Sequence, residues 1–357
     1  MTIGSKIKRI RVQKHLSQEQ LADALGYKDK SMICKIEKDQ TKMSYEKMNL
    51  FIKKFDLSAA ELFHDALDII KTHSKILTIQ DISCYGQCSI TVALPILSAC
   101  GYETAILPTS ILSTHTSGFK DFVAKDMDKE LLEFSNHWKK EQLQFDVIYT
   151  GYLGSISLVD FTLSAIDNFK KDNTLIFVDP AFGDRGKLYP VFKEDYAFKM
   201  RELIAKANVI KPNVTEACYL SGTPYKEHYD KQFIEDLIIS LSQFTDATIV
   251  MTDVSFDKET TGVYVYEDKH FKYYKHQKLG EGFHGTGDVF SASFLAALLK
   301  THNVYSSAKL AADYIYRCIK NTLDDQSHWY GVKFEQLLND YVNRLNNKKG
   351  KKSHESI

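Results

Sequence analysis

The strongest signal in the sequence is the stretch Gly285-Thr286-Gly287-Asp288, which continues as the apolar helical run Val289-Phe290-Ser291-Ala292-Ser293-Phe294. Glycines let a backbone approach a phosphate closely, and a helix N-terminus offers it free N–H groups and a partial positive charge. An aspartate at this place repels phosphate, so Asp288 fits a base that deprotonates an attacking hydroxyl. The amides of Gly285, Thr286 and Gly287 would hold the developing charge. The alternative is an ordinary glycine turn with an aspartate cap.

The sequence before this turn alternates between strand-like and helical patterns. Short β-rich runs occupy residues 76–79, 104–107, 147–150, 175–178, 208–210 and 248–251. Helical periods separate them, as at 89–99 and 158–169, and 261–277 has the pattern of a hairpin. This alternation predicts an α/β fold with a mostly parallel sheet and helices on both faces.

Polar side chains follow two of these strands. Asp179 and Asp184 come after the run at 175–178, and Asn213 and Glu216 follow the next run. Open α/β sheets place their ligands at the carboxyl ends of strands. Asn213 and Glu216 share one helical face, and with Asp179 they offer oxygens that suit Mg²⁺. The alternative is a pair of solvated turns with Asn213 as a helix cap.

The order of these motifs resembles the pyridoxal/pyridoxamine kinase branch of the ribokinase superfamily over about residues 74–345. The matching stretches are Ile79-Gln80-Asp81-Ile82-Ser83-Cys84-Tyr85-Gly86, Ser113-Thr114-His115-Thr116-Ser117-Gly118, Thr150-Gly151-Tyr152-Leu153-Gly154-Ser155, Asp179-Pro180 to Leu188-Tyr189, Pro212-Asn213 with Glu216-Ala217, and the Gly285 to Asp288 turn. The resemblance implies a ribokinase-like homodimer that uses ATP and Mg²⁺ to phosphorylate the 5′-hydroxyl of a B6 vitamer (pyridoxal, pyridoxamine or pyridoxine).

The resemblance also implies roles for individual residues. Asp288 would be the general base and the Gly285–Gly287 backbone the anion hole. Asp179, Asp184, Lys211, Asn213, Glu216 and Thr252 would bind ATP or Mg²⁺, with Asp179 and Glu216 nearest the metal. Thr116, by hydrogen bonding, and Tyr152, by its ring, would line the pyridine pocket.

Two of the predicted site residues are among the departures from the family pattern. Asp81 replaces a serine, and it either pairs with a protonated pyridine nitrogen or is a solvated turn residue. Lys211 replaces a threonine, and it either adds a charge to the ATP phosphates or points outward. These changes leave the substrate open, with hydroxymethylpyrimidine or a sugar as alternatives.

The N-terminal region has a different character. Residues 1–55 hold 13 Lys and Arg against 6 Asp and Glu in a chain with no net charge. Short helices are predicted at about 7–15, 17–25, 31–38, 44–52 and 57–63, with Ser17 and Gln20 as a capping box. The stretch from Ser17 to Glu37 resembles a phage-repressor-type (XRE) helix-turn-helix. The resemblance implies that the third helix enters the major groove, with DNA contacts from Gln18, Lys28, Lys30, Ser31, Met32 and Lys35. A packing or dimerisation bundle is the alternative.

These patterns divide the chain into a helix-turn-helix domain at 1–65, a kinase domain at 74–346 and a disordered tail at 347–357. No apolar run is long enough for a membrane span, and no secretory signal is present. Six scattered cysteines indicate reduced thiols in the cytoplasm. The competing functional class is a transcription regulator whose kinase-like body only senses a B6 vitamer or ATP.

Overall fold

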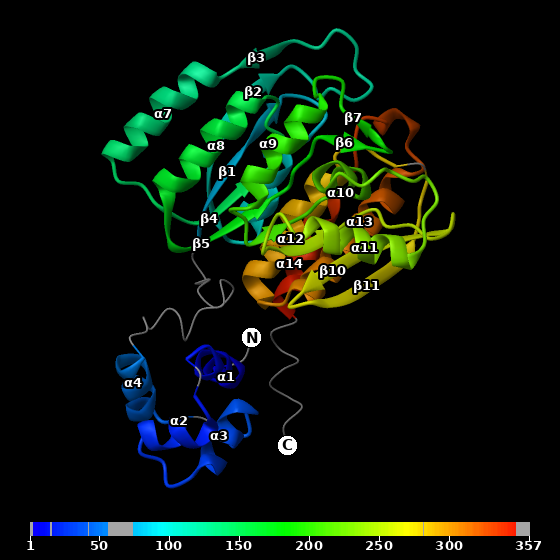
Figure 1. Ribbon diagram of the computed structural model, residues 1–357. Helices are drawn as coiled ribbons and strands as arrows, with labels where there is room; N and C mark the ends of the chain where they lie inside the picture. The colour runs from blue at the N-terminus through cyan, green and yellow to red at the C-terminus, as the bar shows by residue number, and fades with distance from the viewer. Residues whose placement is uncertain (1–2, 15, 42, 56–73, 281, 348–357) are drawn as a thin grey trace. The chain divides into compact units, whose positions relative to one another are not determined.

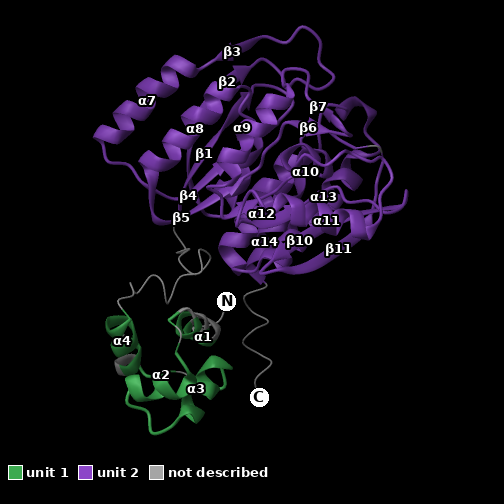
Figure 2. Cartoon of the chain, in the orientation of Figure 1, with its two compact units in different colours: residues 1–69 green, residues 70–357 purple. Residues whose placement is uncertain are grey.

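A computed structural model describes residues 3–14, 16–41, 43–55, 74–280 and 282–347. The chain forms two units, Met1–Ile69 and Ile70–Ile357 (Figure 2). The helix predicted at 57–63 and the tail from residue 348 lie outside the described residues. No helix in the described ranges has both the length and the apolar character to cross a membrane.

The first unit is helical, as the sequence predicts. Its described helices are α1 (Ile3–Gln13), α2 (Gln18–Ala24), α3 (Lys30–Glu37) and α4 (Tyr45–Lys54). Ser17 caps α2 in the predicted capping box with Gln20, and Ser44 caps α4. Buried apolar side chains from all four helices form one core, composed of Ile7, Ile10, Leu21, Ala22, Leu25, Ile33, Ile36, Met43, Met48 and Phe51.

The second unit is built on a nine-stranded sheet with the order β11-β10-β9-β8-β5-β4-β1-β2-β3 (Figure 1). Six neighbouring strands are parallel, namely β2 (Glu103–Leu112), β1 (Lys75–Ser83), β4 (Phe145–Thr150), β5 (Lys170–Val178), β8 (Val209–Ile210) and β9 (Thr248–Met251). The edges are antiparallel and consist of β3 (Ala124–Asp126), β10 (Thr260–Glu267) and β11 (His270–Gln277). The carboxyl ends of the six parallel strands therefore share one edge of the sheet, where the predicted site residues lie.

Helices cover both faces of this sheet, which confirms the predicted fold class. One layer contains α6 (Ile90–Ala99), α12 (Thr286–Thr301), α13 (Val304–Thr322) and α14 (Glu335–Asn347). The other contains α7 (Asp128–Lys140), α8 (Ile156–Phe169), α9 (Glu194–Ile204), α10 (Val214–Ser221) and α11 (Lys231–Leu241). Every residue from Val289 to Leu299 of α12 is buried, because this helix packs against both α6 and α13.

The sequence does not predict the small hairpin that follows β5, which consists of β6 (Gly183–Asp184) and β7 (Lys187–Leu188). Two-residue strands are too short for an alternating pattern, so their sequence carries no strand signal. The six cysteines are free thiols, as expected.

Candidate active site and nucleic-acid interface

Asp288 lies in the first turn of α12, directly after the glycine-rich turn. Gly285 caps this helix with φ +75°, and a Cβ there would lie 2.9 Å from the carbonyl oxygen of Gln87. Both the backbone conformation and the close approach require glycine. The turn therefore brings the free N–H groups of α12 against the segment that precedes α6.

Ser89, the N-cap residue of α6, contacts Asp288 through its backbone. Its φ of 52° and ψ of −120° are unusual for a residue with a side chain. Such strain persists only where the surroundings enforce it, and it gathers at functional sites. The backbone N–H of Ser89 donates a hydrogen bond to the Asp288 carboxylate. The conformation of Ser89 thus serves to aim a donor at this carboxylate.

The environment of Asp288 raises its pKa to about 7. Burial is the largest cause, and repulsion by the Asp179 and Asp81 carboxylates adds to it. The Ser89 N–H and the Lys211 ammonium oppose this shift but do not cancel it. A carboxylate with a pKa near neutrality can both accept a proton and exist in the ionised form at physiological pH, as a general base must.

Asp179 follows β5 and is almost completely buried. Its Oδ2 accepts a hydrogen bond of 2.7 Å from the Ser291 hydroxyl of α12 and lies 2.8 Å from Lys211 Nζ. Its Oδ1 is buried without a hydrogen-bond partner. Lys211 therefore points inward, and the alternative of an outward-pointing lysine is wrong.

Asn213 and Glu216 form a capping box at the start of α10. Asn213 Oδ1 accepts from the Glu216 N–H at 2.9 Å, and Glu216 Oε2 accepts from the Asn213 N–H at 2.8 Å. Glu216 Oε1 accepts from the Phe182 N–H at 3.1 Å. Burial raises the pKa of Glu216 to about 8, although Lys211 opposes the shift. Both residues thus act as structural groups that fix the strand-to-helix turn beside Asp179.

The predicted metal residues, Asp179 and Glu216, are partly engaged by protein donors, which fits the expectation of Mg²⁺ held partly through water. Three of their four carboxylate oxygens have protein hydrogen-bond donors. Only Asp179 Oδ1 has no protein partner. Within the described part of the chain, no three His, Cys, Asp or Glu side chains gather as a cluster, but Mg²⁺ bound with a nucleotide usually takes only one or two carboxylates.

The other predicted phosphate-site residues lie around this centre. The half-buried Thr252 follows β9, and its N–H donates to the Pro212 carbonyl at 3.0 Å. Asp184 is exposed on the β6–β7 hairpin, where it accepts the N–H of the neighbouring Arg185. A pocket of about 460 Å³ opens beside the glycine-rich segment, and it is lined by Arg185, Lys258, Lys278 and Gly280.

The predicted substrate residues differ in how deeply they are buried. Asp81 is buried near the end of β1, and burial raises its pKa to about 6, so it is no solvated turn residue. Burial also raises the pKa of the half-buried Tyr152 to about 12, and the Asp81 carboxylate contributes to this shift. Thr116 is exposed, whereas its neighbour His115 is buried and bonds the Tyr330 carbonyl through Nε2 at 2.7 Å. Asp81 and Tyr152 are therefore close together, and Thr116 lies at the surface.

The site predicted from the sequence does not include Ser89, Ser291 or the three basic side chains that line the pocket. Ser291 stands three residues after Asp288 on the same helix, so a helical-face argument finds it. The conformation of Ser89 and the convergence of Arg185, Lys258 and Lys278 depend on tertiary structure and have no local signal.

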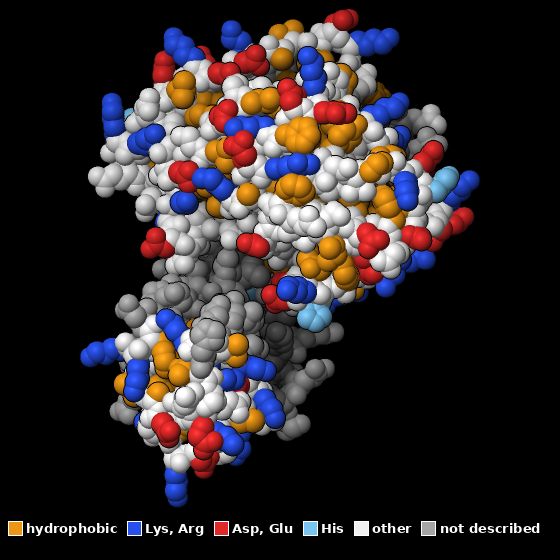
Figure 3. All heavy atoms as spheres, viewed as in Figure 1, with side chains coloured by type: hydrophobic (Ala, Val, Ile, Leu, Met, Phe, Trp, Pro, Cys, Tyr) orange, Lys and Arg blue, Asp and Glu red, His pale blue; other side chains and the backbone are white. Residues whose placement is uncertain are grey.

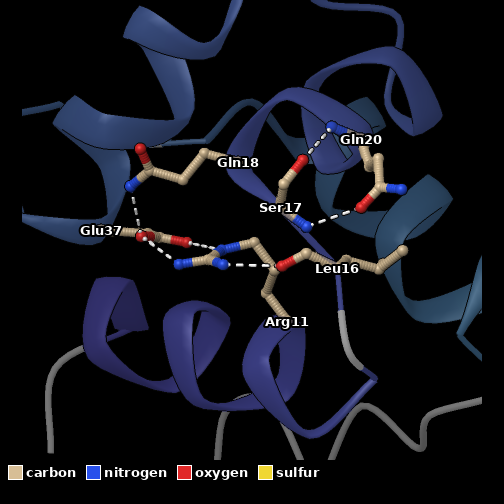
Figure 4. Close-up of polar contacts among 6 residues, drawn as sticks. All are labelled: Arg11, Leu16, Ser17, Gln18, Gln20 and Glu37. Atoms are coloured by element: carbon tan, nitrogen blue, oxygen red, sulfur yellow. Dashed lines mark hydrogen bonds and ion pairs between the residues drawn. The ribbon is translucent and has the colours of Figure 1, made fainter.

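In the N-terminal unit, a buried ion pair joins α1 to α3 (Figure 4). Arg11 Nε lies 2.5 Å and Nη2 3.1 Å from the two oxygens of Glu37, and Arg11 Nη1 donates to the Leu16 carbonyl at 2.7 Å. The side chains of Arg11 and Glu37 are only 11% and 2% exposed. Gln18 Nε2 also donates to Glu37 Oε2 at 2.8 Å, so Glu37 fixes the Gln18 amide that we expect to contact DNA.

The remaining predicted DNA-contacting residues lie on one exposed segment. Lys28, Lys30, Ser31, Met32 and Lys35 all reach solvent on α3 or in the turn before it. Lys30 forms an ion pair with Glu19 at 3.4 Å, but both side chains are 62% exposed, so this contact is weak. In the view of Figure 3, Lys and Arg side chains are spread over the smaller unit with some Asp and Glu side chains among them, and basic and acidic groups are also interspersed on the larger unit.

A parallel sheet whose carboxyl ends meet a glycine-rich helix start bearing Asp288 defines a ribokinase-type kinase. The phosphomethylpyrimidine kinase family model matches residues 94–332, and a helix-turn-helix model matches residues 7–62. The chain belongs to this kinase family and carries an N-terminal helix-turn-helix domain.

Individual relatives agree with this assignment. A crystal structure of pyridoxal kinase from Lactobacillus plantarum is 32% identical, with a TM-score of 0.71 over 77% of this chain and 98% of that one. A putative phosphomethylpyrimidine kinase from Bacteroides thetaiotaomicron, crystallised with pyridoxal, is 33% identical, with a TM-score of 0.71 over 75% and 95% of the two chains. A pyridoxal kinase from Arabidopsis thaliana is 28% identical over 70% of this chain and 83% of its own length.

Proposed function

We propose that the chain transfers the γ-phosphoryl group of ATP to the 5′-hydroxyl of a B6 vitamer. The observation that carries this proposal is the pairing of Asp288, a base with a pKa near 7, with the buried carboxylate of Asp81 and the ring of Tyr152. An aromatic wall beside a buried carboxylate suits a pyridine ring that can be protonated on nitrogen. The two relatives crystallised or named with pyridoxal support the same substrate class.

In the proposed reaction Asp288 accepts the proton of the substrate hydroxyl. The hydroxyl oxygen then bonds to the γ-phosphorus while the bond to the β–γ bridging oxygen breaks, and ADP leaves. The N–H groups at the start of α12 would stabilise the charge on the transferred group. The cationic pocket of Arg185, Lys258 and Lys278 would hold the nucleotide phosphates. Mg²⁺ bound to the nucleotide would neutralise phosphate charge, and in this proposal Asp184 and Thr252 would contact that complex.

A competition assay tests the substrate. The full-length protein, MgATP and an equimolar mixture of pyridoxal, pyridoxamine, pyridoxine and hydroxymethylpyrimidine are incubated together, and mass spectrometry identifies the phosphorylated products. We expect a B6 vitamer phosphate to form first. A preference for hydroxymethylpyrimidine, the substrate named in two other relatives of this chain, would overturn the substrate assignment and leave the kinase assignment in place.

We further propose that the helix-turn-helix unit binds DNA, because its five predicted contact residues outside the Glu37 network are all exposed. A homodimer would present two such units to two half-sites. The test is a titration of the full-length protein with its own upstream region and with a scrambled duplex at fixed salt. Equal affinity for both duplexes would reduce the unit to a non-specific basic surface.

A further inference from the structure

Lys211 is a buried cation at the centre of the phosphate end of the site. It follows β8, and its side chain is 6% exposed. Its Nζ lies 2.8 Å from Asp179 Oδ2. Burial by itself would lower the pKa of this amine, but the carboxylates of Asp179, Glu216 and Asp288 reverse the effect and raise it. The group therefore remains an ammonium ion at neutral pH.

This ammonium lies directly beneath the glycine-rich turn. A Cβ built on Gly287 would be 3.6 Å from Lys211 Nζ, with no closer atom outside the adjoining backbone. The N–H groups of the turn and the Lys211 charge thus belong to one positively polarised surface. The cation that neutralises Asp179 here is a side chain, the ammonium group of Lys211.

We propose that Lys211 does the electrostatic work of a bound monovalent cation, so that phosphoryl transfer by this chain needs no free K⁺ or NH₄⁺. The inference rests on the proposed kinase function. Lys211 neutralises Asp179, which would otherwise repel the transferred phosphoryl group, and it adds positive potential under the Gly287 amide. Its ammonium group occupies the position beside Asp179 that a free ion would take.

Replacing the tethered ammonium by a small side chain should create a site for a free ion. In Lys211→Ala the space vacated by the amine is lined by Asp179 Oδ2 and the Ser291 hydroxyl, both of which are oxygens. Potassium and ammonium ions prefer such a site, whereas tetramethylammonium is too large for it. The matched control is Lys206→Ala, because Lys206 also pairs with an aspartate, Asp167 at 2.6 Å, but on the surface with 37% exposure.

The first measurement is the turnover of wild type and of both variants with saturating MgATP and pyridoxal in tetramethylammonium buffer. NH₄Cl or KCl is then added stepwise at constant ionic strength, and the turnover is measured again. The turnover of wild type and of Lys206→Ala should change less than about twofold on addition of either salt. In tetramethylammonium buffer, the turnover of Lys211→Ala should be about 10²-fold below that of wild type, the usual effect of removing one charge-stabilising group. Saturating NH₄⁺ or K⁺ should then raise the turnover of Lys211→Ala at least about tenfold. Strong activation of wild type by K⁺, or no rescue of Lys211→Ala by either ion, would overturn the proposal.

The second measurement does not depend on catalysis. A ligand that binds only the folded state raises the melting temperature. The melting temperature of Lys211→Ala should rise with NH₄⁺ or K⁺ relative to tetramethylammonium, and that of wild type should not distinguish these ions. If Lys211→Ala does not fold in tetramethylammonium, recovery of the folded protein in KCl gives the same answer, and failure to recover contradicts it. If wild type phosphorylates none of the substrates, the proposed function fails, and the melting experiment still decides the cation site.

Discussion

The pH dependence of turnover gives the sharpest prediction for Asp288. Its pKa of about 7 lies far above the ordinary aspartate value because burial and the Asp179 and Asp81 carboxylates disfavour its ionised form. Only the ionised form can accept the proton of the substrate hydroxyl. With this pKa, about a tenth of the free enzyme is competent at pH 6 and about nine tenths at pH 8. We therefore expect kcat/KM to rise about tenfold between these values.

The assay is a coupled measurement of ADP release under first-order conditions in substrate, with product formation checked at each pH. Asp288→Asn keeps the shape but cannot accept the proton, so its turnover should be lower by about 10²-fold or more and should lack the rise near pH 7. Asp81→Asn is the control that keeps the base. The Asp81 charge raises the pKa of Asp288, so its removal should lower that pKa. In this variant kcat/KM should therefore still rise with pH, but at a lower pH than in wild type. A flat wild-type profile from pH 6 to 8, or near-normal turnover by Asp288→Asn, would refute the reasoning.

Three further predictions address other parts of the chain. Tyr152→Ala should raise the KM for pyridoxal more than the KM for ATP, with Tyr152→Phe nearly unchanged in both; a change in the ATP constant alone would show that the pocket is misplaced. Arg11→Met leaves Glu37 buried without its ion-pair partner and should lower the free energy of unfolding of the N-terminal unit by about 3–5 kcal/mol. Hydrogen exchange of the α1–α3 amides measures this loss. Lys14 is exposed, so Lys14→Met should change the same free energy by less than about 0.5 kcal/mol. Lys35→Ala should weaken specific DNA binding and reduce the slope of log affinity against log salt by about one. Lys53→Ala on α4 should leave the preference for the specific sequence intact. An equal loss of specific binding in both variants would argue against base recognition by α3.

The sequence predicts the sheet and the order of the site motifs because each motif follows a strand. Asp179 and Lys211 come directly after buried runs, so parallel pairing alone carries them to one edge of the sheet. The capping boxes at Ser17 and Asn213 are equally local, since a cap and its partner are three residues apart. These features need no knowledge of the tertiary structure beyond the strand order.

What the sequence leaves open depends on contacts between distant residues. The Ser291 hydroxyl meets Asp179 across 112 positions, and Gln18 meets Glu37 across 19. The inward direction of Lys211 follows from the same packing, because the ammonium can be buried only where a carboxylate accompanies it. No local pattern reports such a pairing, and for that reason the sequence alone leaves the orientation of this lysine undecided.

Phosphorylation of a B6 vitamer is tested by measuring the kcat/KM of the full-length protein with MgATP for each substrate separately. We expect pyridoxal, pyridoxamine or pyridoxine to have a higher kcat/KM than hydroxymethylpyrimidine, with the 5′-phosphate as product and activity lost in Asp288→Asn. A higher value for hydroxymethylpyrimidine, or no phosphorylated product from any of the three vitamers, would contradict it.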